Sequence, residues 1–82
     1  MTKTELKKAI NAALPKGWRL AFISMKHKAF MVTCPIGDRF DVALGTYNRN
    51  IRRIEKAANA DCDGGEFLVG GDTYENFFYL KV

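Results

Sequence analysis

The sequence lacks any apolar run of the roughly 18 residues that a membrane-spanning helix requires, so no membrane partner is expected. Its first eight residues also lack the apolar stretch of a secretory signal. The two cysteines, Cys34 and Cys62, have no CxxC spacing and no companion histidine pair, which excludes a structural zinc site and disfavours a disulfide. No phosphate-binding loop, nucleophile elbow or HExxH motif occurs either. These absences predict a cytoplasmic protein that needs no metal and no cofactor.

The 82 residues are enough for one small domain and too few for a two-domain enzyme or a dinucleotide-binding fold. The composition, 48% hydrophobic and 27% charged, is typical of a globular protein and argues against disorder. The net charge of +4 is unevenly distributed, because residues 1–59 hold 12 Lys and Arg against 4 acids, whereas residues 60–82 hold one Lys against 5. The basic body favours a polyanion partner, with plain solubility as the alternative.

The first half of the chain predicts one helix and three strands. Thr2 and Glu5 form a capping-box pattern, apolar residues then recur at helical spacing, and Pro15 ends the helix. Alternating residues predict strands over 18–25, 29–34 and 39–44, joined as an antiparallel meander. In the first of these strands, alternation assigns Trp18, Leu20 and Phe22 to the same face.

The second half predicts a helix that opens at Gly45 and Thr46, an acidic loop over 61–65, and a β-hairpin formed by residues 66–69 and 74–82. The expected fold class is therefore α+β. It has an α-β-β-β-α core with a C-terminal β-hairpin, and an antiparallel sheet carries two helices on one face. We expect a single domain over residues 1–82, with the hairpin as an extension of the core.

The second predicted helix carries a cationic stripe at i, i+3, i+4 and i+7, formed by Arg49, Arg52, Arg53 and Lys56. Like charges at this spacing repel, and Glu55 is the acid near enough to relieve them. A phosphate backbone would offset the repulsion, so the stripe favours nucleic-acid binding. A solvated helix face and an acidic protein partner remain alternatives. The acidic segment 61–75 could also fold against the stripe and close it.

Lys26, His27 and Lys28 follow the first predicted strand. A lysine on each side disfavours a further positive charge on the imidazole, which leaves His27 available as a base near neutral pH. Cleavage of RNA by general acid–base chemistry needs such a proton acceptor near the 2′-hydroxyl. The alternative is a polar residue in a basic hairpin turn.

Two further clusters lie in the C-terminal region. The last predicted strand is apolar on both faces, so either both faces are buried or one apolar face is exposed to a protein partner. In the second case, Phe77 and Tyr79 are the candidate contacts for a homodimer or another protein. Asp61, Asp63 and Glu66 lack the spacing of a calcium loop and predict a plain acidic loop instead.

Residues 4–59 resemble the HicA family of small toxin ribonucleases. The resemblance is carried by an amphipathic helix that ends at Gly17-Trp18, by His27 at the family's distance, and by Phe30 three positions after it. Met25 and Lys26 stand where the family has Gly and Ser. The resemblance implies a fold similar to a double-stranded-RNA-binding domain, an mRNA-cleaving toxin with His27 as general base, and a HicB-type antitoxin partner. The competing hypothesis is a non-enzymatic phage or mobile-element module that inhibits a host protein.

Overall fold

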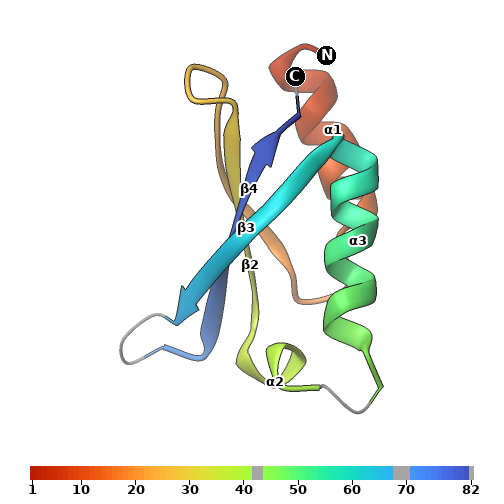
Figure 1. Ribbon diagram of the computed structural model, residues 1–82, viewed down its shortest axis with the longest axis vertical. Helices are drawn as coiled ribbons and strands as arrows, with labels where there is room; N and C mark the ends of the chain where they lie inside the picture. The colour runs from red at the N-terminus through yellow and green to blue at the C-terminus, as the bar shows by residue number, and fades with distance from the viewer. Residues whose placement is uncertain (42–43, 68–70, 82) are drawn as a thin grey trace.

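The computed structural model describes residues 1–41, 44–67 and 71–81. Three helices and four strands follow one another as α1 (Lys3–Ala13), β1 (Arg19–Ser24), β2 (Ala29–Pro35), α2 (Ile36–Arg39), α3 (Thr46–Ala58), β3 (Ala60–Phe67) and β4 (Thr73–Leu80). The strands form one antiparallel sheet in the order β1-β2-β4-β3, and α1 and α3 lie side by side along one side of it (Figure 1). The α+β class, the antiparallel sheet and the helices packed on it are confirmed.

Helix α1 forms for the reasons that its sequence predicts. The Thr2 hydroxyl accepts a hydrogen bond from the Glu5 amide at 3.2 Å, and the Glu5 carboxylate accepts one from the Thr2 amide at 2.9 Å. Leu6 and Ile10 are buried against the sheet. The helix ends at Ala13, ahead of Pro15, and Gly17 takes a positive φ of 88° that a side chain would strain.

The strand predicted over residues 39–44 is wrong for the residues described there, because Arg39 ends helix α2 and Phe40, Asp41 and Leu44 are in no strand. Val42 and Ala43 lie outside the described residues. Pro35 ends β2 and caps the single turn of α2, because its fixed φ suits a helix start. The indole of Trp18 donates a hydrogen bond to the Asp38 carboxylate at 2.8 Å, which ties α2 to the start of β1. The aromatic ring of Phe40 stacks on that of Phe67 at a centroid distance of 5.5 Å rather than entering the sheet.

Strand β4 therefore occupies the position beside β2 that the third strand of the predicted meander would have taken. The predicted hairpin is present, but β3 begins at Ala60, so the predicted loop over 61–65 is part of a strand. A β-bulge between Cys62 and Gly65, with Gly64 at φ 91°, accommodates the glycine pair within that strand. The C-terminal hairpin thus forms half of the main sheet.

The core lies between the sheet and the helices. Phe30 and Phe78 stack at its centre with ring centroids 4.7 Å apart, and Ile54 of α3 is fully buried with them. Asn76, also fully buried, donates to the Val32 carbonyl at 3.0 Å. Its carbonyl oxygen accepts a hydrogen bond from the Tyr47 hydroxyl. Burial of an amide is tolerated because both of its polar ends are hydrogen-bonded.

Candidate nucleic-acid interface

The outer surface of α3 is cationic. Ile51, Ile54 and Ala58 point into the core, so the residues on the opposite side of the helix point away from the sheet. We call this surface the cationic helix face, and its four exposed cations are Arg49, Arg52, Arg53 and Lys56. The predicted stripe is therefore a continuous, solvent-exposed surface of one helix.

The acid closest to these cations in the sequence does not neutralise them. Glu55 is turned toward β3, where its carboxylate accepts a hydrogen bond from the Cys62 amide at 2.8 Å. Within the part of the chain that the structure describes, the one ion pair joins Lys81 to Asp61, at 3.6 Å, and includes none of the four cations of this face. The cationic helix face therefore keeps its full positive charge toward solvent, which suits a polyanion.

The candidate base lies in the turn between β1 and β2. His27 is exposed, and its Nδ1 lies 2.9 Å from the Ser24 hydroxyl, which also accepts a hydrogen bond from the His27 amide at 3.3 Å. Lys28 closes the turn with a positive φ of 52°, and Lys26 is exposed in the same turn. Ser24 therefore orients the imidazole through one nitrogen and leaves Nε2 as the nitrogen available to a substrate.

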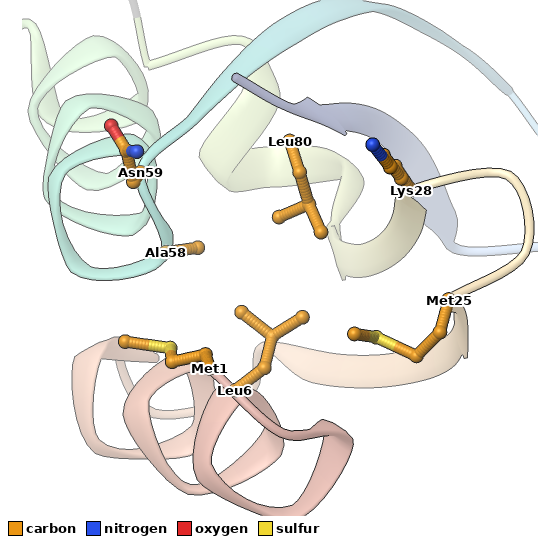
Figure 2. A pocket seen from close by; sticks show the side chains of 7 residues that line it. All are labelled: Met1, Leu6, Met25, Lys28, Ala58, Asn59 and Leu80. Atoms are coloured by element: carbon orange, nitrogen blue, oxygen red, sulfur yellow. The ribbon is translucent and has the colours of Figure 1, made fainter. Parts of the chain in front are cut away.

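A pocket of about 340 Å3 separates this turn from the end of α3 (Figure 2). It is lined by Met25 and Lys28 of the turn, Ala58 and Asn59 at the end of α3, Met1 and Leu6 near the start of α1, and Leu80 of β4. The turn thus lies across this pocket from the C-terminal end of α3. Arg49, in the first turn of the helix, lies at the opposite end. The structure therefore does not gather the predicted basic residues and His27 into one compact site.

The face of the sheet turned away from the helices is aromatic. Phe77 and Tyr79 alternate with buried residues of β4 and point to this side, and Tyr79 is 49% exposed. Direct strand partners place Met31 beside Phe77 and Phe22 beside Met31. We call this surface the open sheet face, and its apolar members are Phe22, Met31, Phe77 and Tyr79. The last strand is therefore not buried on both faces: one of its two apolar faces is exposed.

Phe22 was assigned to the wrong face by simple alternation. A β-bulge between Leu20 and Phe22 inserts Ala21 without a partner, so Leu20 and Ile23 both pack on the core and Phe22 turns outward, 50% exposed. One extra residue in a strand moves the side chains of all later residues of that strand to the opposite face of the sheet. An alternating sequence carries no signal for such a bulge. Met31 was not predicted as part of this surface either, because its place there depends on β4 lying beside β2 and bringing Phe77 next to it.

The acidic residues of β3 and β4 lie on the sheet, not on the helices. Asp61 and Glu66 are the strand partners of Tyr79 and Glu75, so all three acids share the open sheet face. The hypothesis that segment 61–75 folds over the cationic stripe is therefore wrong for the described residues. Across the described residues, no group of three or more His, Cys, Asp and Glu side chains is placed to hold a metal ion.

Both cysteines are free thiols. Burial raises the pKa of the Cys34 thiol above its usual value, and it does the same for Cys62. Both thiols are therefore protonated at neutral pH, and neither is activated as a nucleophile.

Comparison with known proteins identifies no relative: no protein family, no curated protein and no solved structure matches this chain. None of the described helices is both long enough and apolar enough to cross a membrane. The function is therefore argued from the surfaces described above.

Proposed function

We propose that the protein binds RNA through the cationic helix face. The observation that carries this proposal is the position of Glu55, which is hydrogen-bonded to β3 and leaves four cations on one surface without an acidic partner among the described residues. Holding four like charges together is unfavourable unless a polyanion neutralises them. Arginine guanidinium groups also match the geometry of phosphate oxygens. The resemblance to HicA proteins supports RNA as that polyanion, and a cytoplasmic location would follow.

Binding would depend on phosphate contacts and would therefore be strongly sensitive to salt. The test is fluorescence anisotropy with a labelled RNA, titrated at several salt concentrations. A variant carrying Arg49→Glu, Arg52→Glu and Arg53→Glu is expected to lose at least about a hundredfold in affinity at low salt. The proposal is wrong if this variant binds RNA like the wild type.

A matched control separates local contacts from overall charge. Lys3, Lys7 and Lys16 are exposed and lie outside α3. Reversing these three lysines to Glu changes the net charge by the same amount as the arginine variant. We expect the control to lose only a few-fold in affinity, because long-range charge effects are screened beyond about 10 Å at 0.1 M salt. Equal losses in both variants would indicate a diffuse charge effect rather than an interface.

Cleavage of the bound RNA is a second candidate function, favoured by the hydrogen bond that orients His27. In this reaction, Nε2 accepts the proton of a 2′-hydroxyl and the 2′-oxygen attacks the adjacent phosphorus. The bond to the 5′-oxygen breaks, water protonates the leaving oxygen, and a cyclic phosphate results. Lys26 and Lys28 would hold the phosphodiester beside the ring. In a HicA-like system, a HicB-type antitoxin would be the protein that covers this turn.

The cleavage hypothesis is tested by His27→Ala, with Ser24→Ala as a positioning variant. We expect His27→Ala to abolish cleavage of a structured RNA while RNA affinity changes less than about threefold, because His27 lies outside the cationic helix face. Ser24→Ala should reduce the rate without removing it, and should shift the pH dependence of the rate. Unchanged cleavage by His27→Ala would eliminate the catalytic role and leave RNA binding intact. Binding to a host protein in place of RNA would instead support the non-enzymatic alternative.

A further inference from the structure

The open sheet face has a charge distribution of its own, which is visible when residues are followed across the strands. The register places one row in the order Arg19, Thr33, Glu75 and Glu66, from β1 at one edge to β3 at the other. This row therefore begins with an exposed cation and ends with an exposed acid. With Asp61 two rows away on the same strand, the face holds three carboxylates, so it does not attract a phosphate backbone.

The next two rows differ in the sizes of their side chains. The middle row runs from Phe22 through Met31 to Phe77, and ends at the β3 bulge, which contains Asp63 and Gly64. The last row runs in the order Ser24, Ala29, Tyr79 and Asp61. In the last row, the large Tyr79 on one half of the sheet is matched by the small Ala29 at the equivalent place on the other half.

We propose that the open sheet face binds the same face of a second copy of this chain, about a twofold axis parallel to the strands. Such an axis exchanges the two edges of the sheet and keeps each row in place. Arg19 of each copy then meets Glu66 of the other. Aligned sheets that pack face to face keep their strands within about 30°, which the long side chains of this edge pair can span.

The same axis also matches the sizes of the facing side chains. Tyr79 of one copy lies over Ala29 of the other, and Met31 lies over Phe77 in both directions. Phe22 projects over the glycine-containing bulge of the opposite β3. The large apolar groups therefore meet small residues or each other, as close packing between two sheets requires.

The alternative twofold axis, perpendicular to the strands in the same plane, is disfavoured by charge. This axis would place each strand over the same strand of the second chain, and the first row of one chain over the last row of the other. Glu66 would then face Asp61 of the second copy, and Arg19 would face Ser24. Juxtaposed like charges oppose association, so this arrangement has no ionic complement.

The size of the face predicts a weak dimer. Four strands about 4.8 Å apart and seven residues rising about 3.4 Å each project over roughly 450 Å2, below the approximately 800 Å2 per partner of a standard interface. We therefore expect dissociation in the micromolar range. The two cationic helix faces would lie on the outer sides of the dimer, so two RNA segments could bind at once.

The test is sedimentation equilibrium of the full chain between about 10 and 500 μM, where a micromolar dimer changes from mostly dissociated to mostly associated. Arg19→Glu should weaken association at least about tenfold, because two ion pairs become two repulsions. The double variant Arg19→Glu with Glu66→Arg should restore it to within about threefold of the wild type. Both positions are exposed, so circular dichroism should show unchanged folding.

Three results would overturn the proposal: a wild type that remains monomeric throughout this range, a double variant as weak as the single one, or loss of RNA affinity in Arg19→Glu with association unchanged. The triple arginine variant of α3 provides the control, since it should associate normally while failing to bind RNA. Failure of the dimer and failure of RNA binding are therefore measured by different variants and different experiments.

Discussion

The cationic helix face and the open sheet face lie on opposite sides of one core, and they differ in charge, since the first carries cations and the second carries mainly carboxylates beside the cation Arg19. The first consists of four exposed cations of α3, while the second holds three carboxylates around exposed aromatic residues. In the helix, residues three and four positions apart share a surface, so one short segment forms a surface of a single chemistry. In the sheet, consecutive residues point to opposite sides. A substitution at one position of β4 can therefore test packing in the core, and a substitution at the next position can test the open sheet face.

The largest difference is expected between Phe78→Ala and Phe77→Ala. Phe78 is fully buried and stacks on Phe30, so its truncation should lower the free energy of unfolding by about 3–5 kcal/mol. Phe77 points to the open sheet face, and its truncation should lower it by about 1 kcal/mol in the dissociated protein. Urea denaturation at low protein concentration measures both values. Similar losses at the two positions would show that the open sheet face is also part of the core.

Local patterns predicted the individual elements better than their arrangement. The capping box of α1 and the apolar stripe of α3 are interactions between residues three or four apart, and both are present. The pairing of β2 with β4 joins residues 38 to 50 positions apart, and it depends on the chain leaving the sheet after Pro35. Single-residue alternation cannot tell whether residues 39–44 enter the sheet or leave it. The predicted meander failed for that reason.

The candidate sites follow the same division. The cationic stripe needed only helical spacing and was predicted residue by residue. The open sheet face was predicted only in part, as Phe77 and Tyr79. Its other half consists of Met31 on β2 and Phe22 on β1, which the bulge at Ala21 turns to this side of the sheet. Whether Glu55 neutralises the cations depended on β3 lying beside α3, a tertiary contact with no local sequence signal.

A second, smaller difference is expected between Asn76→Ala and Glu75→Ala, again neighbours on β4. Removal of the Asn76 amide leaves the Tyr47 hydroxyl and the Val32 carbonyl without their partner inside the core. The expected loss in unfolding free energy is about 2–3 kcal/mol. Glu75 lies on the open sheet face, and its truncation should change stability by less than about 0.5 kcal/mol. Thermal unfolding of the two variants measures the difference between their losses of stability. The two losses would be similar if Asn76 were hydrated in the native state.

The salt dependence of RNA binding sharpens the comparison at the level of single contacts. Arg52→Gln should reduce the slope of log affinity against log salt by about 0.7–0.9, since one phosphate contact is lost. Arg19→Gln, on the open sheet face, should leave the slope unchanged. Both slopes can be measured by anisotropy between about 50 and 200 mM salt. A reduced slope for Arg19→Gln would place RNA on the sheet side and contradict the separation of the two faces.

The smallest expected effect concerns the acids of the helix layer. Glu5 of α1 and Glu55 of α3 both accept a hydrogen bond from a backbone amide, Glu5 from Thr2 and Glu55 from Cys62. The backbone hydrogen bond from Thr2, followed by the hydrogen bond with its side chain, lowers the pKa of Glu5 below its usual value. The stabilisation from ionised Glu5 is therefore complete above its unfolded pKa and is lost as pH falls through the lower, folded pKa.

Glu5→Gln removes this titration and allows the sign to be tested. The melting temperature of the wild type should exceed that of Glu5→Gln near pH 7, and the two values should converge as the pH is lowered toward 3. RNA affinity should be nearly unchanged, because Glu5 lies outside the cationic helix face and is already engaged by an amide. If the difference in melting temperature grew on acidification, the charged form would not be the one that caps α1. An acid on the helix layer would then remain available to neutralise nearby cations, and the separation of charge between the two faces would be less complete than the structure indicates.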